Sequence, residues 1–210
     1  MRILTLMIVL SAAAAAADEV TYQFRSVEDP AFPPDASLCS QAPFRVNVLL
    51  GASLWSQETR EHDGKVAVPQ ARRIGKATAC VQLTNFLFPP GLQQNFYVVF
   101  ELPSGRYTAN GTCTLTSNDV PQAGLVLAGC ALKLIGAPAH VLGGAVSSLS
   151  TFNPAHLAGF STGSVWTVQA YTDGEAPPRC AGHEQKDLQH HEDSRSDAEI
   201  EAARARAVAP

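Results

Sequence analysis

The stretch RYTANGTCTLT, residues 106–116, decides the fold. Its side chains alternate between two kinds along the chain. One set is polar and consists of Thr108, Asn110, Thr112, Thr114 and Thr116; the other is apolar or small and consists of Tyr107, Ala109, Gly111, Cys113 and Leu115. An alternation of period two is typical of a β-strand whose two faces lie in different surroundings. The stretch therefore predicts a strand in a sheet with two different faces.

Similar short runs continue on both sides of this strand. They cover residues 44–49, 77–88, 95–102, 124–135, 141–152 and 163–171, and turn signals such as Asp63-Gly64 and Ser104-Gly105 separate them. No stretch from 44 to 172 has a helical period of adequate length. Short strands with turns every 8–12 residues or so are typical of a closed or two-layered β fold. We expect an all-β protein built as an antiparallel eight-stranded barrel, with a two-sheet β-sandwich as the alternative.

Charge is sparse in this region. Hydrophobic residues make up 46% of the chain and charged residues 16%, and the net charge is −4. A negative chain is unsuited to general nucleic-acid binding. Between 75 and 172 the charged residues are Lys76, Glu101, Arg106, Asp119 and Lys133. An open sheet normally carries charge along its edges, so a closed barrel or packing into a homo-oligomer is expected.

The ends of the chain differ from its centre. Residues 1–17 have a charged start, an apolar run and an alanine-rich end, the plan of a secretory signal peptide. Residues 18–43 contain four prolines and predict an extended lead-in. Residues 44–182 form the predicted barrel domain, and the polar tail 183–210 is expected to be disordered or short-helical. The mature chain is therefore expected in the periplasm or outside the cell, with no membrane span.

Two stretches carry a resemblance to a known superfamily. They are IGKATACV at 74–81 and FYVVFELPSGRYTANGT at 96–112, followed by Gly143-Gly144-Ala145 before a later strand. This pattern resembles the allene oxide cyclase-like and dirigent-like barrels over about 74–172. The resemblance implies an eight-stranded antiparallel barrel. It carries over no catalytic residue, because no active-site motif of that superfamily is present.

Five cysteines are present, and export favours disulfides. Cys113 and Cys130 lie at equal distances from the turn near Pro121, so they can face each other in a hairpin. Cys39 and Cys180 flank the barrel segment and are expected to tie its ends together. This pairing leaves Cys80 without a partner. Free thiols in the core remain an alternative for Cys113 and Cys130.

Glu101 is the one acidic residue in the central strands and the first candidate for acid–base chemistry, with Tyr97 and Asn153 as further polar candidates. Alternation places Glu101 on the face opposite Phe96 and Phe100. Because the aromatic face is the better core, Glu101 is expected to point outward. The candidate ligand contacts are Phe96, Phe100, Phe152 and Trp166.

His183, His190 and His191 belong to the polar tail and do not form a convincing metal site. No cofactor is expected. These observations favour an exported barrel that binds a small apolar molecule or acts as a non-catalytic scaffold. A cyclase or isomerase that encloses an apolar substrate is the enzymatic alternative, and a structural envelope or surface protein is the third.

Overall fold

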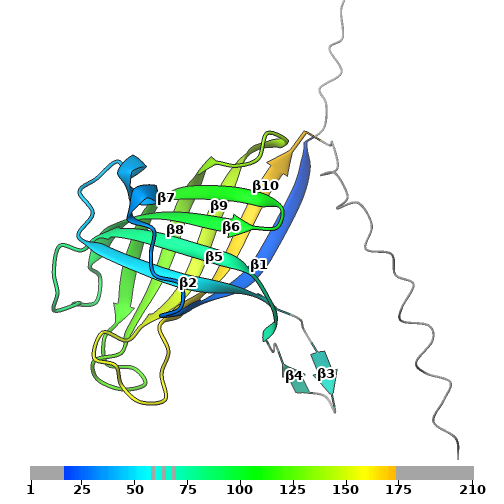
Figure 1. Cartoon of the computed structure of the whole chain (residues 1–210). Helices are drawn as coiled ribbons and strands as arrows, with labels where there is room; N and C mark the ends of the chain where they lie inside the picture. Colours follow the sequence, from blue (N-terminus) through cyan, green and yellow to red (C-terminus); the bar gives the residue numbers. More distant parts are fainter. Residues whose placement is uncertain (1–16, 58–59, 63–64, 68–69, 174–210) are drawn as a thin grey trace, which may run out of the picture. The chain divides into compact units, whose positions relative to one another are not determined.

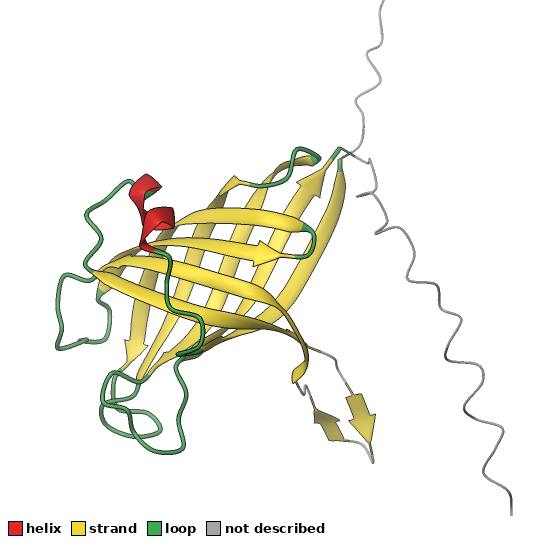
Figure 2. Ribbon diagram, viewed as in Figure 1, coloured by secondary structure: helices red, strands yellow, loops and turns green. Residues whose placement is uncertain are grey.

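The computed structural model describes residues 17–57, 60–62, 65–67 and 70–173, and the side chains of 72–173 within the last range. Eight strands close into an antiparallel barrel in the order β1-β10-β9-β8-β7-β6-β5-β2 (Figures 1 and 2). The strands are β1 (Asp18–Glu28), β2 (Val48–Gln57), β5 (Gln70–Gln82), β6 (Gln93–Leu102), β7 (Gly105–Ser117), β8 (Val126–Gly136), β9 (Val141–Phe152) and β10 (Gly163–Thr172). A short hairpin of β3 (Arg60–His62) and β4 (Lys65–Ala67) interrupts the connection from β2 to β5. The predicted barrel is confirmed, and the sandwich alternative is wrong.

The alternation along β7 sets which side chains face the lumen. Tyr107, Ala109 and Cys113 belong to the buried core, as do Phe96 and Phe100 of the neighbouring β6. The threonines of β7 lie on the outer side of the strand, as the period-two pattern predicts. At the centre, the Phe100 ring packs edge-on against Phe24 and Trp166, with centroids 5.2 and 5.1 Å apart.

The barrel begins earlier than the sequence indicated. Residues 18–28 are not part of a lead-in but form β1, which pairs with β10 from Asp18 to Val27 and with β2 from Phe24 to Glu28. The Trp166 indole Nε1 donates a hydrogen bond of 3.0 Å to Ser26 Oγ inside the barrel. The predicted boundary at residue 44 is therefore corrected to residue 18.

The segment from β1 to β2 runs back along the outside of the barrel. Its 3-10 helix η1 (Ala36–Gln41) begins at Asp35, whose Oδ1 accepts a hydrogen bond of 2.9 Å from the Ser37 N–H. Leu38 and Phe44 of this segment pack against Tyr97 on the outer side of β6. Figure 1 shows this blue segment covering one side of the barrel wall.

A glycine makes room for this covering segment on β2. A Cβ atom built on Gly51 would collide with the backbone oxygen of Phe32. Since no larger residue leaves that space, Gly51 lets the chain after β1 lie directly on the sheet.

The structure contains two disulfides among its described residues. Cys113 and Cys130 face each other on β7 and β8, so that prediction is confirmed. Cys39 pairs with Cys80, with Cα atoms 5.7 Å apart, which corrects the predicted pairing of Cys39 with Cys180. The reason is the path of the covering segment, which brings Cys39 of η1 onto the outer side of β5. Cys180, the predicted signal peptide and the predicted tail fall on 1–16 and 174–210, outside the described residues.

Removing the Cys39–Cys80 bridge is expected to destabilise the barrel by about 2–4 kcal/mol, because it releases a loop closed over 41 positions in the unfolded chain. The double variant Cys39→Ala/Cys80→Ala tests this by urea denaturation. Mass mapping of unreduced peptides provides the direct check. A joined peptide of Cys39 and Cys180 would contradict the pairing described here.

Candidate ligand-binding site

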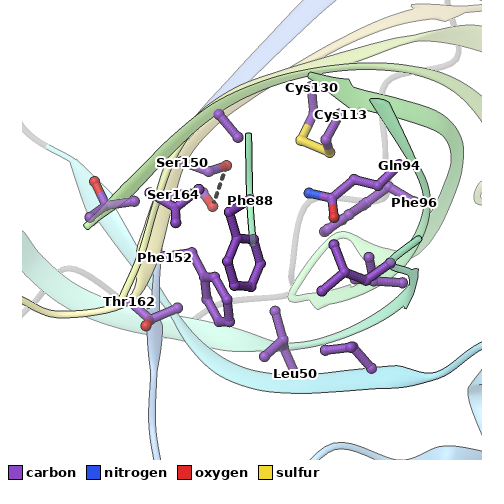
Figure 3. Close-up of a pocket in the computed structure, with 16 residues that line it drawn as sticks. Leu50, Phe88, Gln94, Phe96, Cys113, Cys130, Ser150, Phe152, Thr162 and Ser164 are labelled. Atoms are coloured by element: carbon purple, nitrogen blue, oxygen red, sulfur yellow. Dashed lines mark hydrogen bonds between the residues drawn. A yellow bond between two sulfur atoms is a disulfide. The ribbon is translucent and has the colours of Figure 1, made fainter. Parts of the chain in front are cut away.

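The lumen holds an apolar cavity near the end at which β1, β5, β7 and β9 finish, here called the mouth. Its volume is about 80 Å³, several times the roughly 10–15 Å³ that one water requires. The lining residues come from seven strands and two loops and are mostly apolar; they include Leu50, Val81, Leu83, Phe88, Phe96, Val126, Ala128 and Phe152. Figure 3 shows the Cys113–Cys130 disulfide in the wall and Phe88 beside Phe152 within the space.

A second, smaller cavity of about 50 Å³ lies further inside. Leu50, Phe96, Thr162 and Ser164 line both spaces, so they are neighbouring parts of one lumen. The inner space also contacts Phe100 and Trp166. The lumen is thus filled by large side chains in its centre and left partly open towards the mouth.

A wider pocket of about 360 Å³ lies at the mouth itself and is called the mouth pocket. Phe88 and Phe152 line both this pocket and the apolar cavity. Their rings meet nearly edge to face, with centroids 5.5 Å apart. The aromatic pair therefore belongs to the wall that the mouth pocket and the apolar cavity share.

Two loops with the same local design build this mouth. In the loop 83–92, the Asn85 oxygens accept from the Leu87 N–H at 2.8 Å and from the Phe88 N–H at 3.4 Å, and Phe88 has φ = 50°. In the loop 153–162, the Asn153 carbonyl accepts from the His156 N–H at 3.1 Å, and His156 has φ = 51°. A residue other than glycine is costly in this left-handed region unless its surroundings hold it there.

Three serine hydroxyls of the lumen wall satisfy one another. Ser164 Oγ donates to Ser150 Oγ at 2.8 Å, and the hydroxyls of Ser150 and Ser148 are 3.0 Å apart (Figure 3 shows the first of these bonds). Hydroxyls that already bond to one another are poor hydrogen-bond partners for a guest, so the serine side of the wall acts largely as an apolar surface.

Two tyrosines lie at the inner end of the lumen. Tyr22 and Tyr107 pack there with ring centroids 5.8 Å apart. Burial, and then the neighbouring Tyr107 phenol, raises the pKa of Tyr22 to about 12. Tyr22 is therefore uncharged at neutral pH and is a poor proton acceptor.

All four predicted ligand contacts line the lumen. Phe96 and Phe152 line the cavity near the mouth, and Phe96, Phe100 and Trp166 line the inner one. The aromatic face of the predicted strands thus became the interior, as the alternation argument required.

The three catalytic candidates are not brought together. Glu101 lies on the outer side of β6, where its carboxylate contacts Lys76 at 3.1 Å and Arg106 at 2.9 Å. Tyr97 is buried on that same outer side, beneath the covering segment. Asn153 lines the mouth pocket, but its side-chain amide is already bonded to the backbone of Leu157 and Phe160. The outward orientation predicted for Glu101 is confirmed.

Sequence reasoning missed Phe88 and Glu28. Glu28 is the last residue of β1 and continues the inward-facing series of Phe24 and Ser26. It lines both the inner cavity and the mouth pocket. The sequence signal for Glu28 was its place two residues after Ser26 and four after Phe24, on the same face of a strand. It was overlooked because 18–43 was interpreted as an extended lead-in.

No family model, curated protein or solved structure matches this chain. Among the described residues, no helix is long and apolar enough to cross a membrane, and no group of three or more His, Cys, Asp or Glu is placed to hold a metal ion.

Replacing Glu101 by Gln is expected to cost no more than about 1 kcal/mol of stability, because its ion pairs lie at the surface. Burial raises the pKa of Glu101, but hydrogen bonds and charges from Lys76 and Arg106 outweigh burial and lower it overall. A lowered pKa stabilises the fold above the ordinary glutamate value of about 4.3 and loses that contribution as pH falls through the folded value. Denaturation at several pH values should therefore show the wild type and Glu101→Gln converging below about pH 4. A difference that persists in acid would contradict the ion-pair explanation.

Replacing Asn153 by Ala is expected to destabilise the protein by about 1–3 kcal/mol, because the buried backbone groups of its loop lose their partners. The matched control is Asn85→Ala, which removes one side-chain bond at 2.8 Å in an exposed setting and should cost less than about 1 kcal/mol. Urea denaturation of both variants measures the difference. Equal costs would show that Asn153 does not hold its loop in the way described.

Proposed function

We propose that this chain is an exported barrel that binds a small apolar molecule in its lumen and performs no covalent chemistry on it. The observation that carries the proposal is the apolar cavity of about 80 Å³ in the lumen, which shares Phe88 and Phe152 with the mouth pocket. An eight-stranded barrel has room for its own side chains or for one small ligand. Removing apolar surface from water at both the guest and the wall drives binding.

The proposed place of action follows from the cysteines. Two cross-linked pairs, one of them lining the lumen, suit an oxidising compartment outside the cytoplasm. Together with the signal-peptide pattern of 1–17, they support export to the periplasm or the exterior. As part of the proposal, we group the chain with the allene oxide cyclase-like and dirigent-like barrels on the strand pattern of 74–172 and on its closed eight-stranded architecture.

One observation favours the alternative of a surface or assembly protein. Leu149 and Val165 lie opposite each other on β9 and β10, on the outer side of the barrel, and are 76% and 43% exposed. Exposed apolar neighbours of this kind are typical of contact surfaces when they form larger patches. This function and ligand binding in the lumen are compatible, because they use opposite faces of the same strands.

The proposal predicts that filling the cavity abolishes binding. Ala128 lines the cavity from β8, and Ala131 on the same strand is exposed on the outer side. With 2-phenylethanol at ten times its Kd, the free energy of unfolding of the wild type should rise by about 1.4 kcal/mol. This gain corresponds to a rise of roughly 3–6 °C in Tm. Ala128→Leu should lose this gain, and the control Ala131→Leu should keep it.

Differential scanning fluorimetry measures these shifts, and isothermal titration calorimetry measures Kd directly. Ala128→Leu must itself remain folded, which far-UV circular dichroism checks. If the wild type shows no shift with 2-phenylethanol or with toluene, or if Ala128→Leu responds like the wild type, the lumen is not the binding site.

A further inference from the structure

We propose that the natural guest of the lumen is an organic cation, an amine or quaternary ammonium compound with a small apolar body. This inference rests on the proposed function and adds the chemical class of the guest. The apolar body of the guest lies in the lumen, and its cationic head lies in the mouth pocket. The argument depends on Glu28, on the aromatic rings beside it and on the charge of the surrounding wall.

Glu28 is the one carboxylate among the described residues that line the two interior cavities and the mouth pocket. It lines both the inner cavity and the mouth pocket and is exposed at the end of β1. Its backbone N–H donates to the Thr162 carbonyl at 2.9 Å, which ties this end of β1 to the loop 153–162. A head group that leaves the cavity towards the mouth therefore meets a fixed negative charge.

Three phenylalanines surround the same space. Phe86, Phe88 and Phe152 all line the mouth pocket with Glu28. Phe86 is 64% exposed, so it presents its ring without being needed to fill the core. The faces of aromatic rings attract cations, and rings combined with a carboxylate are a common way to recognise ammonium groups.

The charges of the lining favour a cation over an anion. The described residues that line the cavities and the mouth pocket include no lysine or arginine. His156 is the other titratable group of the mouth pocket. An anionic head in the mouth pocket would be repelled by the Glu28 carboxylate. No lysine or arginine among the described lining residues would offset that repulsion.

The backbone conformation around the mouth pocket also favours a functional role for this pocket. Phe88 and His156 are the two non-glycine residues with positive φ among the described residues, and both line this pocket. Backbone held in costly conformations is concentrated at functional sites. Here the conformation aims Phe88 towards Phe152, which completes the aromatic wall beside Glu28 (Figure 3 shows the two rings together).

Three ligands of matched size and different charge test the proposal. They are 2-phenylethylamine, 2-phenylethanol and phenylacetate, titrated by calorimetry at about pH 8, where imidazole groups are uncharged. The amine is expected to bind about three- to tenfold more tightly than the alcohol, since an exposed ion pair and a cation–π contact are each modest. Phenylacetate is expected to bind more weakly than the alcohol.

Two variants and one control locate the preference. Glu28→Gln should reduce the preference for the amine to the share that the aromatic rings supply, while leaving the affinity for the alcohol unchanged. Phe86→Leu should reduce the preference for the amine in part. The control Glu19→Gln removes the same charge from the outer side of β1, where Glu19 accepts a bond of 2.7 Å from Gln169, and should keep the preference.

The outcomes separate this inference from the proposed function. If none of the three ligands binds, the lumen does not hold small apolar molecules and both fail. If all three bind with equal affinity, or if phenylacetate binds most tightly, the lumen binds guests but the assignment to cations is overturned. An amine preference that is undiminished in Glu28→Gln also overturns it.

Discussion

The pairing of β1 with both β10 and β2 is the constraint on which the rest of the structure depends. Without β1, the other seven strands would leave two edges with unpaired backbone groups. Ten register pairs join β1 to β10 and five join it to β2, so closure pairs β10 along its whole length and β2 along half of its ten residues. The bond from Trp166 to Ser26, across 140 positions of sequence, secures this junction from inside. A lumen exists only because this junction closes.

Closure by β1 also places Glu28 and the start of the covering segment at the mouth. β1 ends at Glu28 on the mouth side and β2 begins at that same end, and the chain between them takes its path over the exterior. That path explains why Tyr97 is buried on the outer face and why Cys39 meets Cys80. The same geometry leaves Glu28 at the opening, as the last inward position of its strand.

The parts of the fold that the sequence predicted are those encoded by local alternation. The pattern of 106–116, the outward side of Glu101 and the pairing of Cys113 with Cys130 all follow from period two and one turn. The parts it did not predict depend on contacts between distant segments. In β1 the charges of Asp18, Glu19, Arg25 and Glu28 obscure the inward series, and Cys39 reaches Cys80 only through the covering segment. Phe96 and Phe100 were predicted as the inward face of one strand, whereas Phe88 reached the site through a loop conformation set by Asn85.

The size of the inward side chains explains why the opening lies where it does. Around the middle and the inner end, the rings of Tyr22, Phe24, Phe100, Tyr107 and Trp166 fill the barrel. Towards the mouth, β8 contributes Ala128, and β9 and β10 contribute serines that bond to one another. Eight strands fix the barrel's width, so small side chains on three adjacent strands leave space that the backbone cannot contract to remove. Phe88 and Phe152 occupy only the outer limit of that space. The resulting cavity has an apolar wall, and Glu28 lines the mouth pocket beside it; the proposed preference for a guest with an apolar body and a cationic head rests on this combination.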